Sequence, residues 1–129
     1  MTNGSNDFGV PFSSIMFLQK MLIENDNVEA FERHDDIVFE ISRRIQRDSL
    51  TIVCVNAYSV SLELIERVVH NFPQTNVIYY GGKWNGATSE AADFCRERNI
   101  GLYNAGALTA ALRKKDFGAD KRANRRRNA

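Results

Sequence analysis

The sequence predicts an α/β protein, and the main observation behind this prediction is a regular alternation over residues 50–112. Apolar runs of strand length, such as LTIVCVNAY and TNVIYY, alternate there with segments of helical period. This alternation is typical of β-α-β units around a largely parallel sheet. A chain of 129 residues also fits one domain of ordinary size. We expect a flexible N-terminus over residues 1–11, a single α/β domain over 12–114 and a disordered basic tail over 115–129.

Apolar spacing predicts the helices. The first begins at Pro11 and ends at Asn25. The second follows the strand LTIVCVNAY, with Ser59 as its expected N-cap, and the third begins at Thr88 or Ser89. A last helix follows the short strand IGLYN. The positions of the second helix that we expect to be buried are Leu62, Ile65, Val69 and Phe72.

Residues 28–47 allow two interpretations. A helix over 35–47 would place Val38, Ile41 and Ile45 along one side. The period-two alternation and the enrichment in Val, Ile and Phe up to Ile41 favour two strands instead. The arginine-rich run RRIQRDS would then connect the second strand to the next one. With strands here, the element order becomes α-β-β-β-α-β-α-β-α, with a mixed sheet of about five strands.

The net charge of +1 conceals an asymmetry along the chain. Residues 113–129 carry eight basic and two acidic side chains, a net charge of +6, so the remaining residues carry −5. A basic segment of this density suggests an anionic partner, with nucleic acid as the first candidate, and a solubilising terminus is an equally good interpretation. The residues of this tail expected to contact phosphates are Lys121, Arg122, Arg125, Arg126 and Arg127.

The cysteines and the apolar runs indicate the compartment. Cys54 and Cys95 fall in a predicted strand and a predicted helix without zinc-ligand spacing, so we expect reduced core thiols in a cytoplasmic protein. No apolar run approaches the ~20 residues that a membrane span needs, and no secretory signal is recognised, so no membrane partner is expected. His34 and His70 are isolated in the sequence and are expected at the surface.

The predicted element order and several local patterns resemble the PD-(D/E)XK nuclease superfamily, which has the restriction endonuclease-like three-layer core, and within it the Mrr-type enzymes. In these enzymes a strand carries an Asp, and the next strand ends in (E/Q)xK with an aromatic residue shortly after. Here Asp35 or Asp36 begins the second strand, and CVNAY over 54–58 stands where (E/Q)xK and its aromatic would be. The glycine turn and alanine-rich helix within 77–112 match the later part of the pattern, so the resemblance covers about residues 12–114.

The resemblance implies a catalytic site, but the chain departs from it. In this family two acidic residues hold Mg²⁺ and the lysine orients the attacking water. Cys54 is a poor ligand for Mg²⁺, and Asn56 cannot act as a base, so we expect no catalysis by the usual mechanism and no cofactor, with Mg²⁺ only if the protein is active. Glu40 follows Asp36 by four residues, which predicts the same strand face. The pair would hold the metal in a relocated site, with Lys83 as the cation; otherwise both acids belong to a solvent face.

The sequence therefore favours a catalytically inactive, nuclease-like domain that binds DNA or RNA or acts within a nucleoprotein assembly. Lys83 and Trp84 of the loop GGKWNG could stack on a base or contact a partner, and core packing of Trp84 is an equal alternative. Two other functions stay open: an active metal-dependent nuclease with relocated residues, and a Rossmann-like ligand-binding or protein-interaction module if residues 28–47 are helical. An exposed first strand would allow a protein partner or a homodimer.

Overall fold

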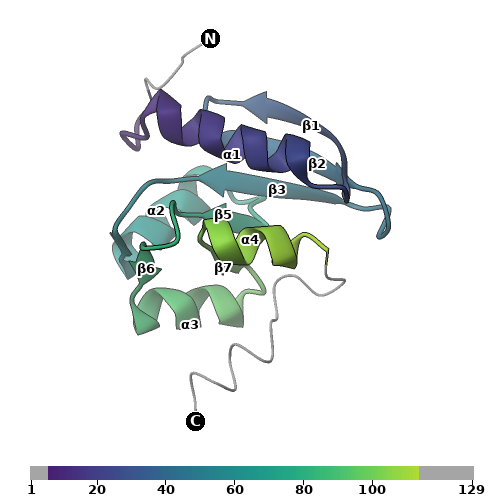
Figure 1. Ribbon diagram of the computed structural model, residues 1–129. Helices are drawn as coiled ribbons and strands as arrows, with labels where there is room; N and C mark the ends of the chain where they lie inside the picture. Colours follow the sequence, from purple (N-terminus) through teal and green to yellow (C-terminus); the bar gives the residue numbers. More distant parts are fainter. Residues whose placement is uncertain (1–5, 114–129) are drawn as a thin grey trace.

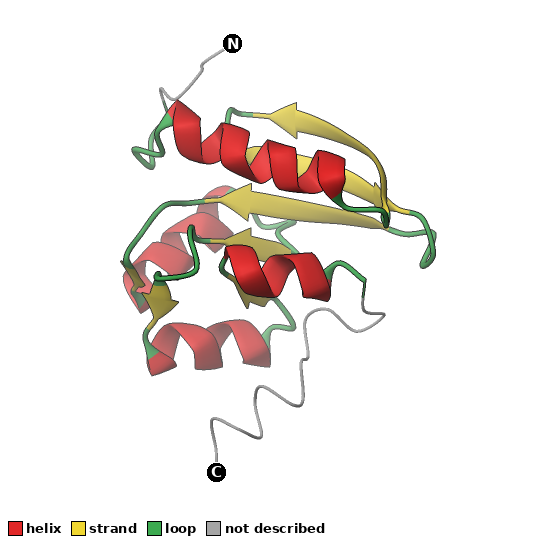
Figure 2. Ribbon diagram, viewed as in Figure 1, coloured by secondary structure: helices red, strands yellow, loops and turns green. Residues whose placement is uncertain are grey.

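The computed structural model describes residues 6–113 and shows an α/β protein. Its elements, in chain order, are α1 (Phe12–Glu24), β1 (Val28–His34), β2 (Val38–Arg43), β3 (Ser49–Cys54), β4 (Ser59–Val60), α2 (Leu62–Asn71), β5 (Val77–Tyr79), β6 (Gly86–Ala87), α3 (Ser89–Glu97), β7 (Gly101–Tyr103) and α4 (Ala105–Ala111). A five-stranded sheet forms the middle layer, with α1 and α4 on one face and α2 and α3 on the other (Figure 1, Figure 2). The predicted α/β class and mixed sheet of five strands are confirmed.

The sheet has the order β1-β2-β3-β5-β7 and changes character at β3. β1, β2 and β3 are antiparallel neighbours, whereas β5 and β7 run parallel to β3 through crossovers made by α2 and α3. β4 and β6 form a separate parallel pair of two-residue strands, which the pattern did not predict. We call the loops after β3, β5 and β7 (residues 55–58, 80–85 and 104) the carboxyl edge. The β2–β3 connection at the opposite end (residues 43–49) is the hairpin end.

Residues 28–47 form strands and a hairpin connection, so the helical interpretation is wrong. β1 and β2 pair with Phe31 opposite Ile41 and Glu32 opposite Glu40. Alternation along β2 buries Phe39 and Ile41 and exposes Glu40. The Rossmann-like alternative loses the helix on which it rested.

The helix starts show where local pattern was sufficient and where it was not. Of the two predicted caps of the third helix, Thr88 is the one that caps α3, because its side chain accepts a hydrogen bond from a first-turn backbone N–H. The predicted cap of α2 at Ser59 is wrong: Ser59 extends to pair with β6, and Ser61 caps the helix. The buried stripe of α2 is also shifted, since Val68 is fully buried where we expected Val69.

The core is a single apolar cluster between the sheet and its helices. α1 contributes Ile15, Leu18 and Leu22, which were predicted from their spacing. Cys54 and Cys95 are both buried and free of any disulfide, as expected for core thiols. Among the helices of residues 6–113, none is both long and apolar enough to cross a membrane.

Candidate nucleic-acid interface

Arginines are concentrated at the hairpin end of the sheet. Arg43 is the last residue of β2, and Arg44 and Arg47 lie in the turn that follows. The side chains of Arg44 and Arg47 are exposed, whereas that of Arg43 is completely buried. The run RRIQRDS was predicted only as a connection, and its density of arginines is the signal that could have marked a site.

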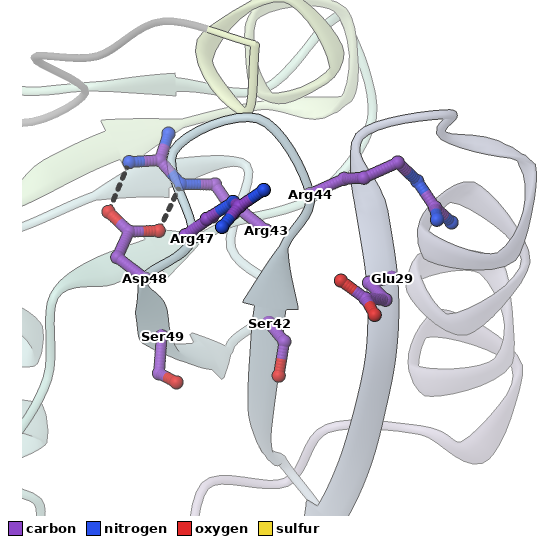
Figure 3. Close-up of a pocket in the computed structure, with 7 residues that line it drawn as sticks. All are labelled: Glu29, Ser42, Arg43, Arg44, Arg47, Asp48 and Ser49. Carbon is purple, nitrogen blue, oxygen red and sulfur yellow. Dashed lines mark hydrogen bonds and ion pairs between the residues drawn. The ribbon is translucent and has the colours of Figure 1, made fainter.

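The buried guanidinium of Arg43 is compensated by Asp48, across the turn. Nε of Arg43 donates to Oδ1 of Asp48 at 2.8 Å and Nη2 donates to Oδ2 at 2.6 Å, which makes a bidentate pair (Figure 3). These hydrogen bonds lower the pKa of Asp48 below its ordinary value, while the partial burial of the carboxyl opposes the shift. The Arg43–Asp48 pair holds the two ends of the turn together, and the side chains of Arg44 and Arg47 face solvent.

The hairpin also holds the C-terminal end of α4. The carbonyl oxygen of Leu112 accepts hydrogen bonds from Nδ2 of Asn27 at 2.7 Å and from Nη1 of Arg43 at 3.4 Å. Oδ1 of Asn27, in turn, accepts from the backbone N–H of Ile45 in the hairpin at 2.9 Å. The last carbonyls of a helix carry partial negative charge, so a cation beside them is favourable. Asn27 and Arg43 therefore fix the end of α4 against the turn.

This contact brings the start of the basic tail to the arginines of the hairpin. Nε2 of Gln46 donates to the carbonyl oxygen of Arg113 at 3.2 Å. Arg113 is the last described residue and the first of the eight basic residues in 113–129. The predicted phosphate contacts of the tail lie outside the described residues: Lys121, Arg122, Arg125, Arg126 and Arg127.

A pocket of about 510 Å³ opens between the hairpin and β1 (Figure 3). The residues that line it are Glu29, Ser42, Arg43, Arg44, Arg47, Asp48 and Ser49. Because Asp48 is paired with Arg43, the remaining charges are two exposed guanidinium groups and the carboxylate of Glu29, which lies on the β1 side. Guanidinium groups and serine hydroxyls are common donors to phosphate oxygens. The pocket is therefore suited to an anion.

Three of the predicted catalytic residues, Asp36, Asn56 and Lys83, lie at the other end of the sheet, whereas Glu40 lies within β2. Asp36, in the β1–β2 turn, is close enough to Cys54 for its charge to act on the thiol. The carboxylate of Asp36 is completely buried, and its oxygens accept from Nη1 of Arg33 at 2.8 Å and from Nδ2 of Asn6 at 2.9 Å. A carboxylate enclosed in this way does not face a metal ion that arrives from solvent.

The predicted metal pair of Asp36 and Glu40 is not formed, because the two side chains lie on opposite faces of the sheet. Arg33, which binds Asp36, is opposite Phe39 on the face that α1 covers, whereas Glu40 is opposite Glu32 on the other face. Asp35 and Asp36, in the turn before β2, have positive φ angles of 50° and 69°. The alternation of a strand therefore does not extend back to Asp36, and the expectation of a shared face was wrong.

The other two predicted catalytic residues also stand apart from a metal site. Burial, and then the charge of Asp36, raises the pKa of the Cys54 thiol to about 12, so this thiol stays protonated near neutral pH. Asn56, two residues further on, is exposed and carries no charge. Lys83 is exposed as well, and its Nζ lies 5.4 Å from the ring centre of Trp84, outside the enclosed surroundings of Asp36.

Asparagines fix the loop that carries Lys83 and Trp84. Nδ2 of Asn104 donates to the carbonyl oxygens of Lys83 at 3.5 Å and of Asn85 at 3.4 Å. Nδ2 of Asn85 donates to the carbonyl oxygen of Tyr80 at 3.1 Å. Trp84 itself is 80% exposed, so the alternative that it packs in the core is wrong.

A further group of ionisable side chains lies on the open face of β1 and β2. Nε2 of His34 is 3.5 Å from Oε1 of Glu32 and 3.7 Å from Oε1 of Glu40. His34 is therefore not isolated, contrary to our expectation, although it lies at the surface as predicted, and so does His70. An exposed histidine between two carboxylates is an ordinary surface ion-pair arrangement, and it includes one residue of the predicted metal pair.

The first prediction concerns Gly81 in the loop after β5. Gly81 has a φ angle of 123°, and a Cβ added there would lie 2.4 Å from Nδ2 of Asn85 and 3.2 Å from Oδ1 of Asn56. We expect Gly81→Ala to lower the free energy of unfolding by roughly 1–3 kcal/mol, measured by urea denaturation. Gly82→Ala is the matched control, because a Cβ at Gly82 meets no atom within 4 Å. Equal losses in both variants would contradict the geometry of this loop.

A second prediction tests the compensation of Arg43. Asp48→Asn should lower the free energy of unfolding at pH 7 by roughly 1–3 kcal/mol, because a buried guanidinium loses its anion. The pKa of Asp48 in the folded protein lies below the ordinary 3.8, so the stabilisation is fully present above pH 3.8 and is lost as the pH falls through the folded-state value. The difference between wild type and variant should therefore shrink in acid. Asp93→Asn, which breaks a more exposed pair with Arg96, is the control, and a similar loss there would count against a special role for Asp48.

No protein-family model, curated protein or solved structure matches the chain. The functional inference therefore rests on the arrangement of this chain's own side chains.

Proposed function

We propose that the chain is a restriction endonuclease-like domain that binds nucleic acid at its hairpin end and does not cleave it. The observation that carries this proposal is the contact between the end of α4 and the hairpin. It gathers Arg44, Arg47 and the start of a segment with a net charge of +6 at one end of the molecule. Basic side chains at this density neutralise phosphates and release counterions, which gives binding with little dependence on sequence.

The arrangement of the strands supports the restriction endonuclease-like assignment. Three antiparallel strands are followed by a helix and a strand parallel to β3, which is the order on which the resemblance rests. The turn that carries Asp36 lies beside Cys54 at the end of β3, where that family would bring its two motif positions together. β1 has a free edge among the described strands, which leaves room for a protein partner or a second copy.

The chemistry of the motif positions supports binding without cleavage. Asp36 is enclosed by Arg33 and Asn6, so it does not offer an open ligand to Mg²⁺. Cys54 keeps its proton, and Asn56 carries neither a charge nor a basic nitrogen. Loss of several groups that act as a unit removes most of the rate. A nuclease that uses Asp36, Glu40 and Lys83 is less well supported, since these three groups are not brought together.

The binding proposal predicts an effect of the exposed hairpin arginines. Arg44→Gln combined with Arg47→Gln should weaken binding to DNA or RNA in filter binding, because two phosphate contacts are lost. The slope of log K against log salt should become shallower by about 1.4–1.8, which is two contacts at roughly 0.7–0.9 each. Lys20→Gln combined with Arg98→Gln removes the same charge from α1 and the end of α3 and should leave the slope unchanged. The absence of any salt-dependent binding by the wild-type protein would overturn the proposal.

The proposal also predicts that the purified protein does not cleave nucleic acid. Single-stranded and duplex DNA and RNA should remain intact on incubation with Mg²⁺ or Mn²⁺, because no open pair of acidic ligands stands at the motif positions. Cleavage that Asp36→Ala abolishes, with the variant still folded by far-UV circular dichroism, would show that the protein is an active nuclease. Cleavage that persists in Asp36→Ala and Glu40→Ala would point to a contaminant.

A further inference from the structure

The carboxyl edge carries two aromatic side chains that contribute little to the core. Trp84 is 80% exposed and Tyr58 is 78% exposed, the two highest values among the large hydrophobic residues within residues 6–113. A single exposed aromatic residue needs no explanation. Here Trp84 and Tyr58 come from two loops whose backbones are joined by hydrogen bonds. A chance coincidence of two exposed rings is therefore a weaker explanation.

The backbone positions of the two aromatic residues are fixed to each other. The N–H of Gly86, two residues after Trp84, donates to the carbonyl oxygen of Tyr58 at 2.8 Å. Directly beyond this bond, β4 and β6 pair through Ser59 and Gly86. On the other side, Asn104 holds the loop through the carbonyls of Lys83 and Asn85. The rings are therefore presented by a braced backbone, so that little conformational entropy is lost when a ligand binds.

The charge and the polar groups at this edge fit a nucleic-acid base. Lys83 is the one charged side chain in the loops of the carboxyl edge, and its ammonium lies over the ring of Trp84. Asn56 is exposed in the neighbouring loop and offers an amide donor and acceptor of the kind that pairs with base edges. Asp35 lies in the β1–β2 turn, two strand positions away from β5, and the exposed acids Glu63 and Glu90 lie in the first turns of α2 and α3, which begin at this end of the sheet.

We infer that the carboxyl edge is a stacking platform for unpaired bases, with Trp84 and Tyr58 as the stacking surfaces and Lys83 as a contact to the neighbouring phosphate. The inference rests on the proposed function and narrows it: the preferred partner is single-stranded nucleic acid, because bases within a duplex have no free face to offer. Aromatic side chains stack on any base, so this platform would not select a sequence. Phosphate contacts at the hairpin end would not select one either.

The experiment uses the intrinsic fluorescence of the protein, since Trp84 is its only tryptophan. Titration with oligothymidylate or oligouridylate of about 12 nucleotides should quench the emission to saturation, whereas a duplex of the same length should leave it nearly unchanged. Trp84→Ala and Tyr58→Ala should each weaken single-strand binding roughly 5- to 150-fold in filter binding, the range expected for the loss of one stacked base. Phe17→Ala is the matched control, because Phe17 is an exposed aromatic residue on α1. It should leave the affinity unchanged.

The outcomes separate this inference from the proposed function. If the salt-dependent binding needs Arg44 and Arg47 but not Trp84 or Tyr58, or if duplex quenches the emission equally, the platform is overturned and the hairpin site stands. If no nucleic acid binds, both fall. If the wild-type protein self-associates in sedimentation experiments and Trp84→Ala abolishes this association, the edge is an interface between copies and the inference is overturned. Unchanged urea midpoints for both alanine variants should show that the exposed rings do not stabilise the fold.

Discussion

The buried guanidinium of Arg43 is the constraint on which the hairpin end depends, because a charge inside a protein must be compensated or the structure is lost. Removing an ion from water costs several kcal/mol, and this cost is recovered only when good hydrogen bonds replace the lost water. Asp48 supplies a bidentate partner, and the carbonyl of Leu112 supplies a helix end. The turn and the C-terminus of α4 are therefore coupled through one side chain. The need to compensate Arg43 therefore brings the exposed arginines of the turn and the end of α4 to the same side of the molecule.

The hairpin end and the carboxyl edge carry different side chains, and they lie at opposite ends of the strands. At the hairpin end, arginines and hydroxyls surround an open pocket. At the carboxyl edge, asparagines, glycines and aromatic residues form loops with a single lysine. β3 has six residues, so the two ends lie roughly 20 Å apart. A single strand of about a dozen nucleotides is long enough to contact both ends of the sheet.

Asp36 is the position at which the expected resemblance would place a metal ligand, but its carboxylate is enclosed. A metal-binding carboxylate must remain open to solvent and be poorly compensated until the ion arrives. Here Arg33 and Asn6 compensate Asp36, and the thiol of Cys54 beside it is neutral. Asp36 is a structural anchor of the β1–β2 turn, where it ties the strands to the segment before α1. The binding proposed above uses phosphate contacts at the hairpin end and does not need an open carboxylate at Asp36.

The sequence by itself determined the α/β class, favoured strands over a helix within 28–41 and limited the cap of the third helix to Thr88 or Ser89, because hydrophobic period and capping chemistry are local properties. It also showed the charge asymmetry of the chain. Only the tertiary structure decided that Glu40 and Asp36 lie on opposite faces, since positive φ angles in a turn leave no mark in the alternation of the strand. The contact of α4 with the hairpin arginines was likewise outside the reach of sequence patterns. This contact joins Arg43 to Leu112, 69 positions further along the chain, through the side chain of Arg43, whose burial depends on the whole sheet.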